Sequence, residues 1–192
     1  VATVAGLRQR GGAGAAYFID YGFPEAEYYH PQRDAGTLVC HRAHRVDDGP
    51  LSDVGDKDIT AHVNFTDVAL AAQDAGLDVL GYTSQSRFLL NCGIAPLMEA
   101  ADLPARATAM KLLAEHEMGE LFKVIGFATP GHPPALGFAA GDRSHRLWAR
   151  QTNDPLDDRH LPGADADQLV HAVVEQAGLW PAAGRFQVQA VR

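Results

Sequence analysis

Cysteine and long apolar runs are both scarce in this 192-residue chain. Only Cys40 and Cys92 occur, too few for a disulfide framework, and we interpret both as small core residues in a reducing compartment. No apolar run approaches the ~20 residues of a membrane-spanning helix, and the N-terminus lacks a signal-peptide pattern. These absences predict a cytoplasmic protein with no membrane partner.

Positive charge is in deficit as well. The chain has 16 Lys and Arg against 24 Asp and Glu, a net charge of −8, which argues against nucleic acid as a partner because phosphate backbones need a basic surface. The sequence also lacks the Gly-x-Gly-x-x-Gly loop, the Gly-x-x-x-x-Gly-Lys phosphate loop and the Gly-x-Ser-x-Gly elbow. Its composition, 46% apolar and 21% charged, is that of an ordinary globular domain with a core.

Residues 14–22 constrain the rest of the chain most. Their apolar run has no helical period and ends in Asp20-Tyr21-Gly22, which predicts a strand covered on both faces of a parallel sheet. Ligands of open α/β sheets bind beyond the carboxyl ends of strands, so Asp20 and Tyr21 are expected near the functional site. A turn-capping role for Asp20 is an equal alternative. Residues 1–10 read as the end of a helix, which predicts an earlier strand and crossover ahead of this chain.

The next two loops and the strand between them contain polar side chains that are candidates for the functional site. Residues 23–31 are aromatic and too irregular for a helix or strand, and we expect them to lie over a cleft or to cover core edges. Residues 36–44 predict a strand with His41 and His44 on opposite faces, which disfavours a metal site. Asp58, Thr60 and His62 alternate along an extended segment, so all three would face one side and converge on a ligand, or belong to a plain solvated loop.

The remaining pattern is an alternation of helices and strands. A helix over 65–75 is capped by Asn64 or Thr66 and closed by Gly76. Gln85 lies in the first turn of a short helix that ends at Gly93. The further expected elements up to residue 139 are a strand at 77–82, amphipathic helices at 96–101 and 104–116, and late antiparallel strands at 119–128 and 135–139. The helix at 104–116 is expected to face inward with Ala107, Met110, Leu113 and Ala114. A linker at 148–163, a helix at 165–177 and a closing strand at 186–190 are expected to follow.

Several sequence motifs, which occur in a fixed order along the chain, carry a family resemblance. They are Phe18-Ile19-Asp20-Tyr21-Gly22, Asp58-Ile59-Thr60-Ala61-His62-Val63-Asn64-Phe65, Thr83-Ser84-Gln85 and Met118-Gly119-Glu120-Leu121-Phe122-Lys123-Val124. Together they resemble the MidA-like family of S-adenosylmethionine-dependent methyltransferases. The resemblance implies an α/β fold of the class I methyltransferase (Rossmann-like) type, with helices on both faces of the sheet and late antiparallel strands. Residues 1–147 would be the C-terminal half of that domain, and 148–192 a linker plus a small helix-strand extension.

The resemblance also implies a cofactor, S-adenosylmethionine, and a protein substrate. The family's glycine-rich loop and ribose-binding acid precede anything that matches Val1, so no cofactor-binding residue is assigned here. Mitochondrial members of the family are assembly factors for respiratory complex I, located in the matrix, that dimethylate an arginine of another subunit. This chain is therefore expected to belong to a protein arginine methyltransferase.

Methyl transfer from a sulfonium is an in-line displacement that depends mainly on alignment. An arginine nucleophile also needs a carboxylate to hold its guanidinium and to accept a proton. The catalytic candidates are Asp20 and Asp58, and the residues expected on the substrate side are Tyr21, Thr60, His62 and Gln85. The alternatives are a non-catalytic assembly or binding module and a metal-dependent hydrolase that uses His41, His44, Asp58 and His62.

Overall fold

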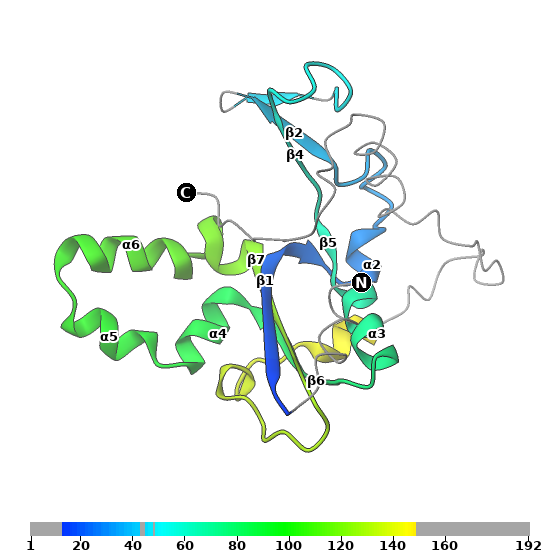
Figure 1. Ribbon diagram of the computed structural model, residues 1–192. Helices are drawn as coiled ribbons and strands as arrows, with labels where there is room; N and C mark the ends of the chain where they lie inside the picture. Colours follow the sequence, from blue (N-terminus) through cyan, green and yellow to red (C-terminus); the bar gives the residue numbers. More distant parts are fainter. Residues whose placement is uncertain (1–12, 43–44, 48, 149–192) are drawn as a thin grey trace.

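The computed structural model describes residues 13–42, 45–47 and 49–148 (Figure 1). The helix end expected at 1–10, His44 and the elements expected beyond residue 148 lie outside the described residues. The strands are β1 (Ala15–Phe23), β2 (Val39–Arg42), β3 (Arg45–Asp47), β4 (Asp58–Thr60), β5 (Val63–Asn64), β6 (Asp78–Ser84) and β7 (Phe122–Ala128). The helices are α2 (Glu25–Tyr28), α3 (Phe65–Asp74), α4 (Gln85–Asn91), α5 (Ile94–Ala100), α6 (Leu103–Leu113), the π-helical turn η1 (Glu115–Gly119) and the 3₁₀ turns η2 (Leu136–Phe138) and η3 (Ser144–Trp148).

The main sheet has the strand order β5-β1-β7-β6. β1 pairs parallel with β5 and antiparallel with β7, and β6 pairs antiparallel with β7. β1 and β6 therefore run in the same direction and end at the same edge. A second, antiparallel sheet of order β3-β2-β4 stands apart from the first (Figure 1).

The strand predicted at residues 14–22 is confirmed and has a parallel neighbour in β5, but it is not covered on both faces. Its long neighbour β7 is antiparallel, and one row of its side chains is open, with Tyr17 44% and Ile19 50% exposed. On that face α4 covers β6 and β7, where Thr83 and Val124 are fully buried. An apolar run shows that a strand is hydrophobic, whereas the burial of its two faces depends on which helices pack against them.

Both faces of the main sheet carry helices, as expected. On one face, α3 and η3 pack on the sheet around a core of Phe65, Ala69, Ala72, Leu77, Tyr82, Ile125, Phe127 and Leu147. α3 begins and ends as predicted: the Asn64 side chain accepts a hydrogen bond from the Thr66 amide, and Gly76 follows with φ +74°. On the other face, Phe138 of η2 lies against Gly126, where a Cβ would come within 2.7 Å of its ring.

Four further expectations need correction. Residues 135–139 form a 3₁₀ turn rather than a strand, and residues 23–31 contain the short helix α2. The strand expected at 36–44 begins only at Val39 and pairs with β3 in a hairpin. Cys92 is exposed, so only Cys40 is a core residue.

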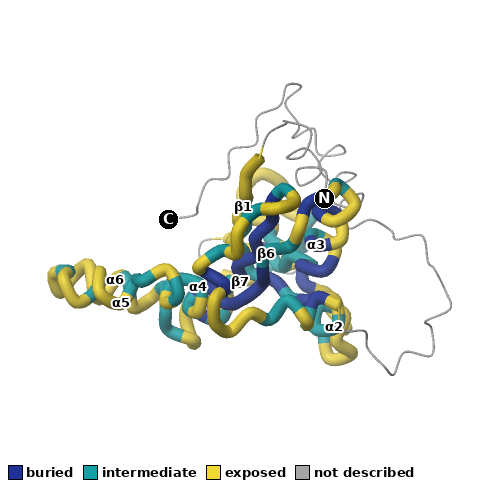
Figure 2. Tube along the Cα trace, turned by 90° about the horizontal axis from the view of Figure 1, so that it is seen from below, coloured by how far each residue is buried: buried dark blue, intermediate teal, exposed yellow. Residues whose placement is uncertain are grey.

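The predicted helices α5 and α6 exist, but their stripes do not face a core. Neither helix contains a buried residue, and Met110, expected inward, is 50% exposed. The pair projects from the sheet as a helical hairpin, coloured as exposed and intermediate in Figure 2. None of the helices in the described part of the chain is long and apolar enough to cross a bilayer.

Candidate functional site

The carboxyl end of β1 is shaped by Asp20, Tyr21 and Gly22. The Tyr21 amide donates a hydrogen bond of 2.8 Å to Asp20 Oδ1, which fixes the carboxylate at the strand end. Gly22 lies opposite Val63 of β5, and a Cβ at Gly22 would be 2.1 Å from the Val63 carbonyl oxygen. Glycine is therefore required for β5 to pair here, and this pairing carries His62, the residue before β5, to the end of β1.

His62 is held among aromatic rings. The Tyr21 ring meets it edge-on at a centroid distance of 5.5 Å, and the Phe23 ring stacks on it at 5.0 Å. The Arg33 guanidinium lies 3.9 Å from the centroid of Phe23. Within the described residues, His62 Nδ1 is buried without a hydrogen-bond partner. A buried ring nitrogen without a partner at a strand end is a group that a ligand can satisfy.

The surroundings shift the pKa values of both ionisable groups. Burial raises the pKa of the Asp20 carboxyl, opposed by the Tyr21 amide hydrogen bond and by the charge of His62. Burial lowers the pKa of His62, opposed by its hydrogen bond to the Thr37 backbone. A carboxylate with a raised pKa is a better proton acceptor, so this pair favours proton uptake at Asp20.

The other predicted site residues lie elsewhere. Asp58 is exposed on β4, opposite His41 in the second sheet, and Thr60 donates its hydroxyl to the Val39 carbonyl oxygen. The expectation that Asp58, Thr60 and His62 share one side is wrong, because β4 ends at Thr60 and the chain then passes to the main sheet. Gln85 is buried, and its side-chain amide donates to the Leu112 carbonyl oxygen. The structure thus brings together Asp20, Tyr21 and His62.

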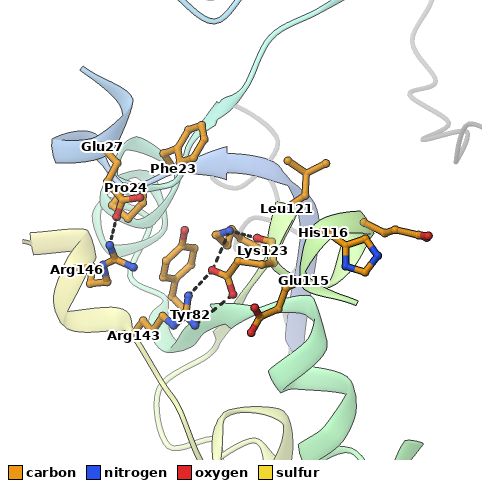
Figure 3. Close-up of a pocket in the computed structure, with 12 residues that line it drawn as sticks. Phe23, Pro24, Glu27, Tyr82, Glu115, His116, Leu121, Lys123, Arg143 and Arg146 are labelled. Atoms are coloured by element: carbon orange, nitrogen blue, oxygen red, sulfur yellow. Dashed lines mark hydrogen bonds and ion pairs between the residues drawn. The ribbon is translucent and has the colours of Figure 1, made fainter. Parts of the chain in front are cut away.

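A pocket of about 430 Å³ opens beside this cluster, and sequence reasoning did not find it (Figure 3). Asp20 lies directly opposite Lys123 in the β1–β7 ladder, so the two side chains leave the same face of the sheet. Lys123 lines the pocket, although Asp20 does not. The full lining is Phe23, Pro24, Glu27, Tyr82, Glu115, His116, Glu117, Glu120, Leu121, Lys123, Arg143 and Arg146.

The cations of this pocket are already paired. Arg143 donates to both carboxylate oxygens of Glu120, at 2.6 and 3.3 Å, and Lys123 Nζ lies 3.5 Å from Glu120 Oε1. Arg146 forms an ion pair with Glu27. Burial alone would raise the pKa of Glu120, but the hydrogen bonds from Arg143 and the charge of Lys123 hold it below its usual value.

Tyr82 presents an unsatisfied group at the pocket. It is 1% exposed, and its hydroxyl is buried without a hydrogen-bond partner among the described residues. Burial raises the pKa of this hydroxyl, which therefore stays protonated. One sequence signal could have revealed the pocket: Lys123 interrupts an otherwise apolar strand, and a lysine is rarely buried without a partner.

The described residues contain no group of three or more His, Cys, Asp or Glu side chains placed to hold a metal ion. His41 and Asp58 face each other on the second sheet, whereas His62 belongs to the end of β1. The set proposed for a metal-dependent hydrolase is therefore divided between two sheets, with His44 outside the described residues.

The main sheet defines the class of protein. Its parallel strands β1 and β6 end at one edge, helices cover both faces, and polar side chains gather at that edge. This is an α/β fold of the kind that binds ligands beyond the carboxyl ends of its strands. The predicted fold class is confirmed, including the late antiparallel strand β7.

Comparison with known proteins gives the family. Residues 1–83 match the model of a family described as "Putative S-adenosyl-L-methionine-dependent methyltransferase". A crystal structure of a candidate methyl transferase from Burkholderia thailandensis, bound to S-adenosyl-homocysteine, is 50% identical with a TM-score of 0.72, over 76% of this chain and 40% of that chain. A native structure of an uncharacterized superfamily protein from the same organism gives the same identity and TM-score, over 76% and 41%.

These matches confirm the resemblance to S-adenosylmethionine-dependent methyltransferases that the sequence shows. The chain spans about two fifths of the length of the solved structures that it matches. The search of curated proteins found no match.

Proposed function

We propose that this chain provides the substrate side of an S-adenosylmethionine-dependent methyltransferase that modifies an arginine of a partner protein. The observation that carries the proposal is the 50% identity, over 76% of the chain, with a structure bound to S-adenosyl-homocysteine. S-adenosyl-homocysteine is what remains of S-adenosylmethionine after methyl transfer. The cluster at the end of β1 supports the assignment because it joins a fixed carboxylate to an unpartnered imidazole nitrogen.

The described residues do not by themselves make a site for the cofactor. No glycine-rich turn follows a described strand into a helix, so the adenosyl and ribose groups have no evident cradle in residues 13–42, 45–47 and 49–148. We therefore assign no cofactor-binding residue to this part of the protein. In the whole protein the bound cofactor supplies the methyl group.

The residues of this chain orient the acceptor and take up its proton. The Tyr21 amide occupies Asp20 Oδ1, which leaves Oδ2 to accept a hydrogen bond from the guanidinium of the substrate. When the methyl group passes to the acceptor nitrogen, its bond to the sulfonium sulfur would break as the new C–N bond forms. The acceptor nitrogen would give up one proton to Asp20, so that the methylated guanidinium keeps a single positive charge, and the raised pKa of Asp20 suits it to that task. The rings of Tyr21 and Phe23, with His62 between them, form an apolar wall that excludes water.

The test uses the full-length natural protein and its Asp20→Asn variant. Calorimetry measures S-adenosylmethionine binding, and mass spectrometry detects methylarginine after incubation with labelled cofactor and proteins from a strain that lacks the gene. We expect Asp20→Asn to slow methyl transfer by about 100-fold or more, the range for a lost proton acceptor, with cofactor affinity within about 2-fold because the cofactor site lies elsewhere.

Asp34→Asn is the matched control, because Asp34 is exposed in a loop and should retain full activity. Unchanged transfer by Asp20→Asn would show that Asp20 is not the acceptor's carboxylate. Absence of cofactor binding by the full-length protein would favour the alternative of a non-catalytic binding module.

A further inference from the structure

We propose that the pocket beside Asp20 is a second subsite, which binds the guanidinium of another arginine of the protein substrate, near the residue that is methylated. The inference rests on the proposed function for the identity of the substrate class. It adds a position that the reaction itself does not require. The pocket is separate from the reacting position because Asp20, Tyr21 and His62 do not line it.

The charge of the pocket favours a cation. Four glutamates line it, together with the side chains of Lys123, Arg143 and Arg146. Glu120 is shared by Lys123 and Arg143, and Glu27 is paired with Arg146. Glu115 and Glu117 of η1 are exposed and have no ion-pair partner in the described part of the chain. Every cation is satisfied while two carboxylates remain open, so an entering group should be positive.

The Tyr82 hydroxyl is the independent sign that a ligand belongs here. Figure 3 shows Tyr82 between Arg146 and Lys123, with its hydroxyl turned away from Arg143. Arg146 is paired with Glu27 and Lys123 with Glu120. A buried hydroxyl without a hydrogen bond is destabilising. Its oxygen can accept a hydrogen bond from a donor that enters between the two ion pairs.

A guanidinium fits these acceptors better than an ammonium. The open acceptors come from separate elements, the carboxylates of η1 and the hydroxyl of β6. A planar group with five N–H donors can reach acceptors on several sides, whereas the three donors of an ammonium radiate from one point.

The direct test measures binding of N-acetyl-arginine amide to the full-length protein by NMR titration. It is done in the Asp20→Asn background, so that the reacting carboxylate does not contribute. N-acetyl-citrulline amide, neutral but nearly isosteric, and N-acetyl-lysine amide are the comparison probes. We expect the arginine probe to bind at least about 10-fold more tightly than either, the equivalent of one net hydrogen bond to a charged group.

Two variants then locate the binding. Tyr82→Phe keeps the ring and removes the unpartnered hydroxyl, so it should weaken the arginine probe by about 5-fold with no loss of melting temperature. Glu115→Gln with Glu117→Gln should weaken it by at least as much, while Glu99→Gln, an exposed glutamate on α5, should leave it unchanged.

No binding of the arginine probe, equal binding of citrulline, or unchanged binding in both pocket variants would each overturn the inference. Its failure is distinguishable from failure of the proposed function, because S-adenosylmethionine binding and methylarginine formation are measured separately. A protein that methylates arginine but ignores the probe refutes the second subsite alone.

Discussion

The proposed catalytic role of Asp20 conflicts with its effect on the stability of the fold. Its carboxylate is half-buried and its pKa is raised by that burial, so its ionised form is less stable in the folded protein than in water. The catalytic role proposed for it requires this ionised form. A residue of this kind is expected to reduce stability in exchange for function.

Replacing Asp20 by Asn should therefore stabilise the protein at neutral pH. Because the folded pKa lies above the ordinary carboxyl value of about 3.9, the folded state binds more protons between the two values, and stability falls as pH rises through that window. Asn keeps an oxygen for the Tyr21 amide but carries no charge. We expect a melting temperature a few degrees higher at pH 7, with the advantage lost below about pH 4.

Circular dichroism melts of the two proteins between pH 3.5 and 7.5 check this expectation, with Asp34→Asn as the exposed control. If Asp20→Asn melts lower than the parent protein at pH 7, the carboxylate is stabilising and the burial argument is wrong.

At the scale of single residues, the sequence predicted part of the candidate site. Asp20 and Tyr21 lie at the end of a strand, and His62 precedes a helix by a few residues, so their position could be inferred from the order of elements. Lys123 signals a buried polar contact, but the walls of the pocket could not be inferred, because the ion pair between Glu27 and Arg146 joins residues far apart in the chain. Local patterns do not report such pairings. Asp58 was misplaced for the same reason, since its partner strand decides its sheet.

Thr66, at the start of α3, links three elements. It is buried, it accepts a hydrogen bond from the Glu25 amide of α2 at 2.9 Å, and its hydroxyl donates to the Leu147 carbonyl oxygen of η3 at 2.9 Å. α2 and η3 in turn carry Glu27 and Arg146 to the pocket. A single hydroxyl therefore helps to position one wall of the pocket.

Thr66→Val should remove both hydrogen bonds while keeping the side-chain shape. Since two backbone groups would be left without partners, we expect a loss of about 2–4 kcal/mol in the free energy of unfolding. Denaturant titration of the full-length protein measures it. Thr108→Val is the control, because Thr108 is exposed and bonds only to the Pro104 carbonyl oxygen within α6. Equal losses of unfolding free energy in the two variants would show that the Thr66 hydroxyl does not link α2, α3 and η3.

Periodicity predicted the elements themselves better than their partners. The stripe of α3 faces the core, but the similar stripe of α6 leaves Met110 half exposed, because no sheet lies under it. Likewise the strand predicted at residues 135–139 is the 3₁₀ turn η2, since five residues are too few to show a period.

The main sheet and the α5–α6 hairpin differ strongly in burial. β7 lies between β1 and β6, is hydrogen-bonded along both edges, and is almost entirely buried. α5 has no buried residue, and Leu97 and Leu103 are 70% and 78% exposed. Few buried apolar contacts imply a low free energy of local opening, so the hairpin should open without the sheet.

Hydrogen exchange of the full-length protein distinguishes these two parts. After correction for intrinsic rates, we expect the amides of α5 to exchange at least about 100-fold faster than those of β7, because β7 opens only with global unfolding. α3, which packs on the core, is the internal control and should resemble β7. Protection of α5 equal to that of β7 would mean that another surface covers the hairpin in the whole protein, and the exposed leucines would then be part of an interface.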